Sequence, residues 1–94
     1  AYGAQPGATT LLYHLGLDAR MIAFIADVSP LHQGRYTPGL HIPVVAPEEL
    51  EARRPDVVVV LAWQDTKAIA ARHPQFLAAG GRFLVPLPVP RLWE

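Results

Sequence analysis

Residues that could bind an anion gather near the start of the chain. The stretch AYGAQPGATTLL, residues 1–12, places two glycines and the hydroxyls of Thr9 and Thr10 before an expected helix. Free backbone N–H groups and the helix dipole attract a phosphate at such a place. The spacing matches neither a dinucleotide-binding fingerprint nor a Walker loop, which need further glycines. Two interpretations therefore stay open: a phosphate site, or a turn in which Gly3 permits a tight bend and Thr9 or Thr10 caps the helix.

A second polar stretch, HQGRYTPGLHIP at residues 32–43, is longer than a minimal connection between elements. Arg35 could form paired hydrogen bonds with a phosphate or carboxylate, and Tyr36 could stack on a ring or contribute its hydroxyl. The alternative is a surface loop in which Arg35 is solvated and Tyr36 covers the edge of the core. His32 and His41 have no third metal ligand in view, so we expect structural or solvated histidines.

Two further candidates follow expected strands. Asp27 ends the apolar run MIAFIA, where a ribose-binding acid lies in nucleotide-binding α/β domains, although it could equally cap the following turn. Trp63 follows VVVVL and could be a stacking platform, but a core aromatic is the expected role. No spacing indicates a Ser-His-Asp order, a close carboxylate pair or a cysteine nucleophile. These residues alone predict a small binding domain without catalytic residues.

Alternating strands and helices must position these residues. Short apolar runs predict strands at residues 21–26, 42–45, 57–61 and 83–85. Spaced apolar residues predict helices at residues 9–15, 47–53 and 66–79, the last interrupted at His73-Pro74. The alternation predicts a Rossmann-like α/β domain, with an open, mainly parallel sheet and helices on both faces. Ligands of such sheets bind outside the carboxyl ends of the strands, where the candidate residues fall.

The bulk composition narrows the classes of partner. The 94 residues form at most one small domain, and we expect residues 1–94 to be a fragment of a longer chain whose first strand is truncated, because no apolar run precedes Gly3. Eight basic and eight acidic residues give zero formal charge, so neither nucleic acid nor an acidic membrane is an expected partner. The absence of cysteine and of an 18-residue apolar run fits a cytoplasmic location.

Four pieces of the sequence resemble the C-terminal domain of SAM-dependent C-methyltransferases that act on nucleotide-linked keto-sugars in deoxysugar pathways. The pieces are AYGA with TTLL, D with P and QGRYTPG.HIP, RPDVVVVLAW, and GGRFLVPLP.PR, in family order over nearly the entire chain. The resemblance implies an upstream zinc-binding domain and a methyltransferase domain that holds SAM and the catalytic base. By the same resemblance, the C-terminal domain closes over the nucleotide-sugar substrate. The 94-residue chain, which corresponds to this C-terminal domain, is then expected to hold no catalytic residue, metal or cofactor.

The resemblance also implies which residues face the substrate. They are Tyr2, Gly3, Thr9, Thr10, Gln33, Arg35, Tyr36 and Trp63. The chain departs from the family pattern where Pro6, Gly7 and Ala8 replace alanine-lysine-glycine, so the phosphate loop lacks its lysine. We expect the substrate-binding domain of an active sugar C-methyltransferase. The alternatives are a decayed or repurposed interdomain scaffold and a free-standing small-ligand binding module.

Overall fold

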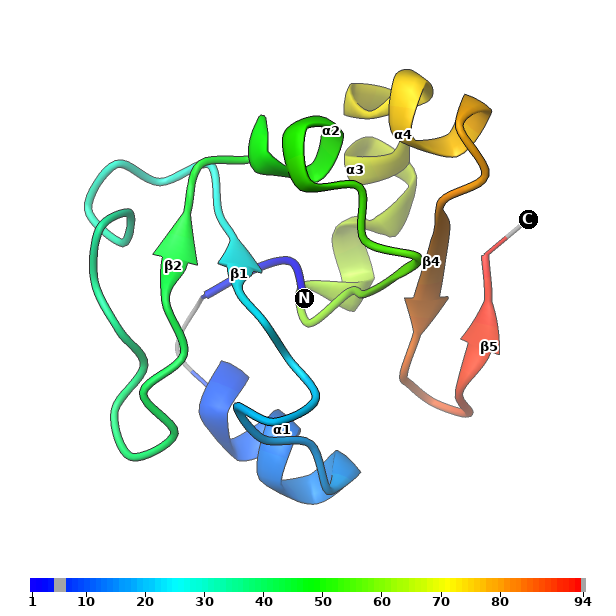
Figure 1. The fold of residues 1–94 in the computed structure, drawn as a ribbon. Coiled ribbons are helices and arrows are strands. Elements are labelled where there is room, and N and C mark those ends of the chain that lie inside the picture. Colours follow the sequence, from blue (N-terminus) through cyan, green and yellow to red (C-terminus); the bar gives the residue numbers. More distant parts are fainter. Residues whose placement is uncertain (5–6, 94) are drawn as a thin grey trace.

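The computed structural model describes residues 1–4 and 7–93. Pro6, one of the departures from the family loop, lies outside the described residues. Short strands form two sheets within these ranges (Figure 1). The strands are β1 (Ile25–Ala26), β2 (Val44–Val45), β3 (Val57–Val59), β4 (Arg82–Val85) and β5 (Arg91–Leu92). β1 pairs in parallel with β2, β3 pairs in parallel with β4, and β5 adds to β4 in the antiparallel direction.

Tyr2 lies between the two sheets. It makes isolated parallel bridges to Ala26 and to Val60, and its N–H donates to the carbonyl of Val59 over 2.9 Å. The predicted α/β class is therefore confirmed. The prediction of an open Rossmann-like sheet is confirmed only in part, because the hydrogen bonds define one small parallel sheet and one small mixed sheet.

Glycine and proline set the limits of the helices. The helical elements are α1 (Ala8–Leu15), α2 (Glu49–Arg53), the 3₁₀ turn η1 (Trp63–Asp65), α3 (Thr66–Arg72) and α4 (Pro74–Ala78). α1 starts after Gly7, whose φ of 92° is a conformation that glycine adopts without strain. Thr9 and Thr10 lie inside α1, and no side-chain hydrogen bond caps its start, so the capping alternative is wrong. The predicted break at His73-Pro74 is confirmed, since Pro74 begins α4.

The strand predicted at residues 21–26 is shorter than expected. The N–H groups of Met21 and Ile22 both donate to the carbonyl of Asp18, which folds this segment into a turn. Met21 is exposed, and regular pairing begins only at Ile25. The first residues of this apolar run therefore form a turn, because their N–H groups bond to the nearby carbonyl of Asp18 and not to a neighbouring strand.

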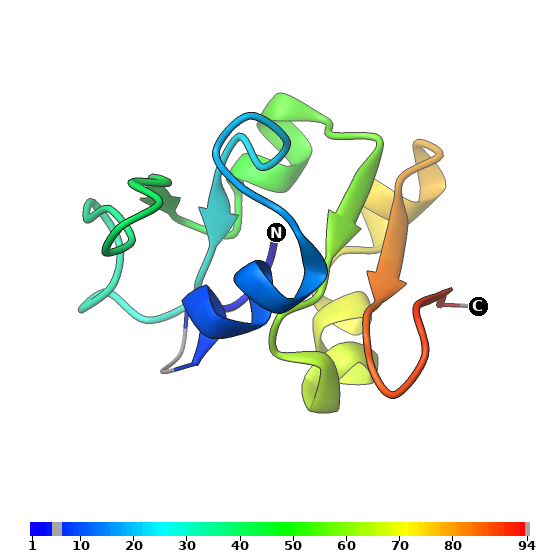
Figure 2. The same cartoon turned by 90° about the horizontal axis from the view of Figure 1, so that it is seen from below.

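Side chains of the strands alternate between two cores, one on each side. On one side Phe24, Ala26, Val58 and Val60 pack with residues of α2, α3 and α4. On the other side Ile25, Val59 and Leu61 pack with residues of α1. Figures 1 and 2 show α1 lying apart from the other three helices. The strands are therefore covered on both faces, as their continuous apolar runs predict.

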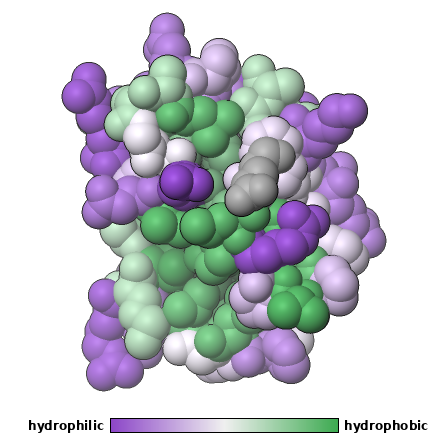
Figure 3. All heavy atoms as spheres, turned by 90° about the vertical axis from the view of Figure 1, so that its right-hand side faces the viewer, coloured by the Kyte–Doolittle hydropathy of each residue, from purple (hydrophilic) through white to green (hydrophobic). Residues whose placement is uncertain are grey.

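The proline-rich tail turns back along the molecule. After β4 the chain bends and returns as β5, which forms the edge of the mixed sheet (Figure 1). Figure 3 views this side and shows a band of apolar residues between hydrophilic ones. Leu92 in β5 and Val89 before it are both exposed. None of the helices in the described ranges has the length and apolar character needed to cross a bilayer.

Candidate functional site

Two cavities lie beside the residues that follow the strands. The loop cavity, about 420 Å³, lies between the start of α1 and the long loop, and its lining includes Gly7, Thr9, His32, Arg35, Tyr36 and Pro38. The strand-end cavity, about 330 Å³, includes Tyr2, Gly3, Asp27, His32, Asp65 and Arg72 in its lining. Among the described residues His32 alone lines both cavities. The two cavities are therefore neighbours across one side chain.

The structure brings some of the predicted site residues together and separates others. Thr9, Arg35 and Tyr36 meet in the loop cavity, and Tyr2 with Gly3 lines the strand-end cavity. Three residues line neither cavity: Thr10, Gln33 and Trp63. Thr10 is exposed on α1, Gln33 donates its side-chain amide to the carbonyl of Asp27 over 2.7 Å, and Trp63 lines a separate hollow of about 190 Å³.

Backbone pairing holds the long loop beside β2 (Figure 1). The N–H of Gly34 donates to the carbonyl of Val44, and the N–H of Val44 donates to the carbonyl of Arg35. The Tyr36 ring stacks on the ring of His41, with centroids 4.2 Å apart and planes 8° apart. Arg35 and Tyr36 are both exposed. The guanidinium and one face of the tyrosine ring therefore stay accessible to a ligand in the loop cavity.

Asp27 organises the turn that follows β1. Its Oδ1 accepts the N–H of Ser29 over 2.7 Å, and its Oδ2 accepts the N–H of Ala4 over 2.6 Å. Burial by itself would raise the pKa of the Asp27 carboxyl, but these two hydrogen bonds and the nearby His32 lower it below the usual value. Both carboxylate oxygens are thus engaged by the chain itself. Of the two alternatives for Asp27, the structure shows the turn-capping one.

His32, which lines both cavities, was not among the substrate-facing residues predicted from the sequence. Its Nδ1 lies 3.1 Å from Oδ2 of Asp27, and its side chain is 39% exposed. From the sequence, a structural or solvated histidine was the expected role, because no third metal ligand was in view. The missed signal is the spacing of an acid and a histidine across a short turn containing Ser29 and Pro30.

A buried polar network lies beneath the strand-end cavity. Nε2 of His73 lies 3.1 Å from the hydroxyl of Tyr2, and its Nδ1 lies 3.1 Å from both carboxylate oxygens of Glu51. Tyr2 and His73 are each only 3% exposed. Burial raises the pKa of the Tyr2 hydroxyl, although a hydrogen bond with Arg72 opposes the shift. Tyr2 therefore stays neutral near pH 7, and its hydroxyl forms a hydrogen bond with His73 inside the protein.

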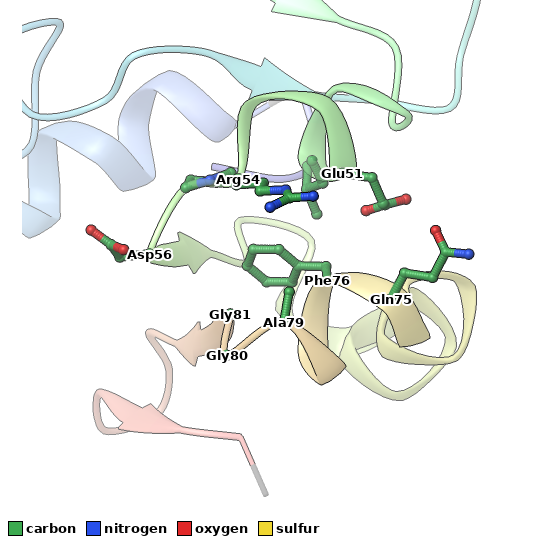
Figure 4. A pocket seen from close by; sticks show the side chains of 10 residues that line it. Glu51, Arg54, Asp56, Gln75, Phe76, Ala79, Gly80 and Gly81 are labelled. Atoms are coloured by element: carbon green, nitrogen blue, oxygen red, sulfur yellow. The ribbon is translucent and has the colours of Figure 1, made fainter.

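A further cavity of about 220 Å³ lies at the opposite ends of β3 and β4, between α2 and α4. Figure 4 shows Arg54 and Glu51 on the side of α2, facing Gln75, Phe76 and Ala79 on the side of α4. Parallel α/β sheets bind ligands at the carboxyl ends of their strands, and this cavity adjoins the amino ends. We therefore take the loop cavity and the strand-end cavity as the candidate site. Within the described ranges no group of three or more His, Cys, Asp or Glu side chains could hold a metal ion.

Comparison with known proteins identifies the family. The family model of the C-methyltransferase C-terminal domain matches residues 1–88, and the chain belongs to this family. C-methyltransferase NovU from Streptomyces niveus is 40% identical over 91 residues. That alignment includes 97% of this chain but only 22% of NovU, so the chain spans less than a quarter of this curated relative. The family resemblance inferred from the four sequence pieces is confirmed.

Proposed function

We propose that this chain is the substrate-binding C-terminal domain of a SAM-dependent C-methyltransferase, and that it binds a nucleotide-linked keto-sugar of a deoxysugar pathway. The observation that carries the proposal is the loop cavity. It places Arg35 and Tyr36 opposite Thr9, from a segment more than twenty residues away in the chain. A guanidinium suits a diphosphate, and an aromatic face suits a base or sugar ring. The cavity volume of about 420 Å³ falls within the range of small-molecule sites.

In this proposal the methyl donor SAM binds to another domain of the longer protein. The oxygens of Asp27, the acid that follows β1, already accept the N–H groups of Ala4 and Ser29 and lie beside His32, so in this proposal Asp27 organises the turn and the ribose of SAM is bound elsewhere. We assign SAM, the catalytic base and the implied zinc to the upstream domains, and this chain supplies substrate contacts.

We also propose that the strand ended by Tyr2 continues upstream and joins the two sheets into one Rossmann-like sheet. The nitrogen of Ala1 donates to the carbonyl of Phe24 over 2.9 Å, and the N–H of Ala26 donates to the carbonyl of Ala1. These are the bonds of a parallel ladder. A preceding residue in extended conformation would continue the same pattern between β1 and β3.

Isothermal titration calorimetry tests the function. We expect the 94-residue chain to bind UDP-glucose or dTDP-glucose and to show no binding heat with SAM. Arg35→Ala should weaken sugar-nucleotide binding about tenfold, because a charge-assisted hydrogen bond is lost. Arg91→Ala in β5 is the matched control, since Arg91 is also exposed but lines neither cavity. A one-site isotherm with SAM, or equal affinities for wild type and Arg35→Ala, would contradict the proposal.

A further inference from the structure

We propose that His32, oriented by Asp27, is a pH-dependent contact to the diphosphate of the bound nucleotide-sugar. This inference rests on the proposed function and extends it to a residue outside the predicted site. Its basis is position: His32 lines both the loop cavity and the strand-end cavity. A ligand that occupies both cavities must therefore lie against the imidazole of His32.

The orientation of the ring follows from its partner. Asp27 is only 7% exposed, and two backbone N–H groups hold its carboxylate in place. The carboxylate is therefore a fixed hydrogen-bond acceptor. With Nδ1 of His32 3.1 Å away, the proton on Nδ1 is directed to Asp27. No described residue forms a hydrogen bond with Nε2. This second nitrogen is therefore available to a ligand, as an acceptor when the ring is neutral and as a donor when it is protonated.

The charges around His32 favour an anionic ligand. Arg35 lines the loop cavity on one side of His32, and Arg72 lines the strand-end cavity on the other. Two acids face the same space: Asp27, which is engaged by backbone N–H groups, and Asp65, which is exposed. The two guanidiniums thus place positive charge on both sides of His32, which favours an anionic ligand there. Because a diphosphate interacts better with imidazolium than with imidazole, its binding must strengthen as His32 gains a proton.

The experiment measures the pH dependence of affinity. UDP-glucose and dTDP-glucose are suitable probes because each phosphorus of their diphosphate has one ester bond, one anhydride bond and one strongly acidic oxygen, whose negative charge does not change near neutral pH. Dissociation constants are measured by calorimetry at about pH 6 and about pH 8, the range in which histidine titrates. The wild type should bind about tenfold more tightly at the lower pH. His32→Gln should bind with the weaker affinity at both pH values.

His14→Gln is the matched control, because His14 is exposed on α1 and lines neither cavity. It should keep the pH dependence of the wild type. If His32→Gln also keeps that dependence and the wild-type affinity, the role of His32 is refuted while the proposed function stands. If the wild type binds neither probe at either pH, the proposed function itself fails, and the role of His32 fails with it.

Discussion

The hydroxyl of Tyr2 lies 3.1 Å from Nε2 of His73, although the two residues are 71 positions apart in the chain. The other nitrogen of His73 faces Glu51 in α2. One buried imidazole therefore connects the strand position of Tyr2 with α2 and with the junction of α3 and α4. Every buried polar side-chain atom in the described residues has a hydrogen-bond partner, and this network is part of the reason.

Replacing Tyr2 with phenylalanine tests this connection. Tyr2→Phe keeps the ring in the core but leaves Nε2 of His73 buried without its partner. We expect the free energy of unfolding to fall by about 1 to 3 kcal/mol, measured by urea denaturation. Tyr13→Phe is the control, because Tyr13 is 62% exposed and should change stability by less than about 0.5 kcal/mol. Equal stabilities of the two variants would show that the Tyr2 hydroxyl contributes nothing to the fold.

Gly81 is predicted to be sterically essential before β4. A Cβ atom built on Gly81 would lie 2.3 Å from two ring atoms of Phe76, and this ring is buried against Phe83 in the core, so it has little room to move aside. Gly81→Ala should therefore destabilise the fold by about 1 to 3 kcal/mol. A double-mutant cycle with Phe76→Leu isolates the clash, because the smaller side chain should remove most of the alanine penalty. A penalty that is the same in both backgrounds would exclude the Phe76 contact as its cause.

If the 94-residue chain is prepared with a free amine at Ala1, burial of this amine should make the free energy of unfolding depend on pH. Burial lowers the pKa of this amine from 8.0 to about 5 in the folded state. Between these values the unfolded chain binds more protons than the folded chain, so stability rises as pH increases from about 5 to 8. The full effect is at most about 4 kcal/mol.

Acetylation of the amine isolates this contribution from the histidines, which titrate in the same range. Urea denaturation of the free and the N-acetylated chain should give stabilities whose difference is nearly constant above about pH 8 and widens toward pH 5. The acetylated chain should be the more stable of the two at the acidic end. A difference that does not change with pH would mean that the Ala1 amine keeps an ordinary pKa.

Gly7 tests whether the first loop approaches a phosphate. No atom lies within 4 Å of a Cβ built on Gly7, but its φ of +92° strains any other residue. Gly7→Ala and Gly7→Lys should therefore both lower stability by about 1 kcal/mol, measured by thermal melting. Relative to Gly7→Ala, the lysine variant should bind a nucleoside-diphosphate sugar up to about 1 kcal/mol more tightly at low salt. Equal affinities of the two variants would show that the loop only turns the chain.

Local patterns predicted the helices better than the strands. The break at His73-Pro74 was predictable because proline lacks an N–H and restricts its predecessor. The prolines before Arg91 argue against a central strand and favour an edge or an extended arm, but the residues of β5 could not be predicted because their pairing depends on where β4 lies. The first residues of the run at 21–26 form a turn, because Asp18 offers them a nearer acceptor.

The sequence by itself determined the α/β class and the family, because apolar periodicity and short motifs are properties of neighbouring residues. It also indicated the two polar segments that form the loop cavity. Only the tertiary structure decided which of their residues meet: Thr9 with Arg35 and Tyr36, Asp27 with His32, and Tyr2 with His73. From the sequence, Asp27 could equally have bound a ligand or capped the following turn. The structure shows the cap, because the nearly buried carboxylate oxygens need partners once water is excluded and the N–H groups of Ala4 and Ser29 supply them.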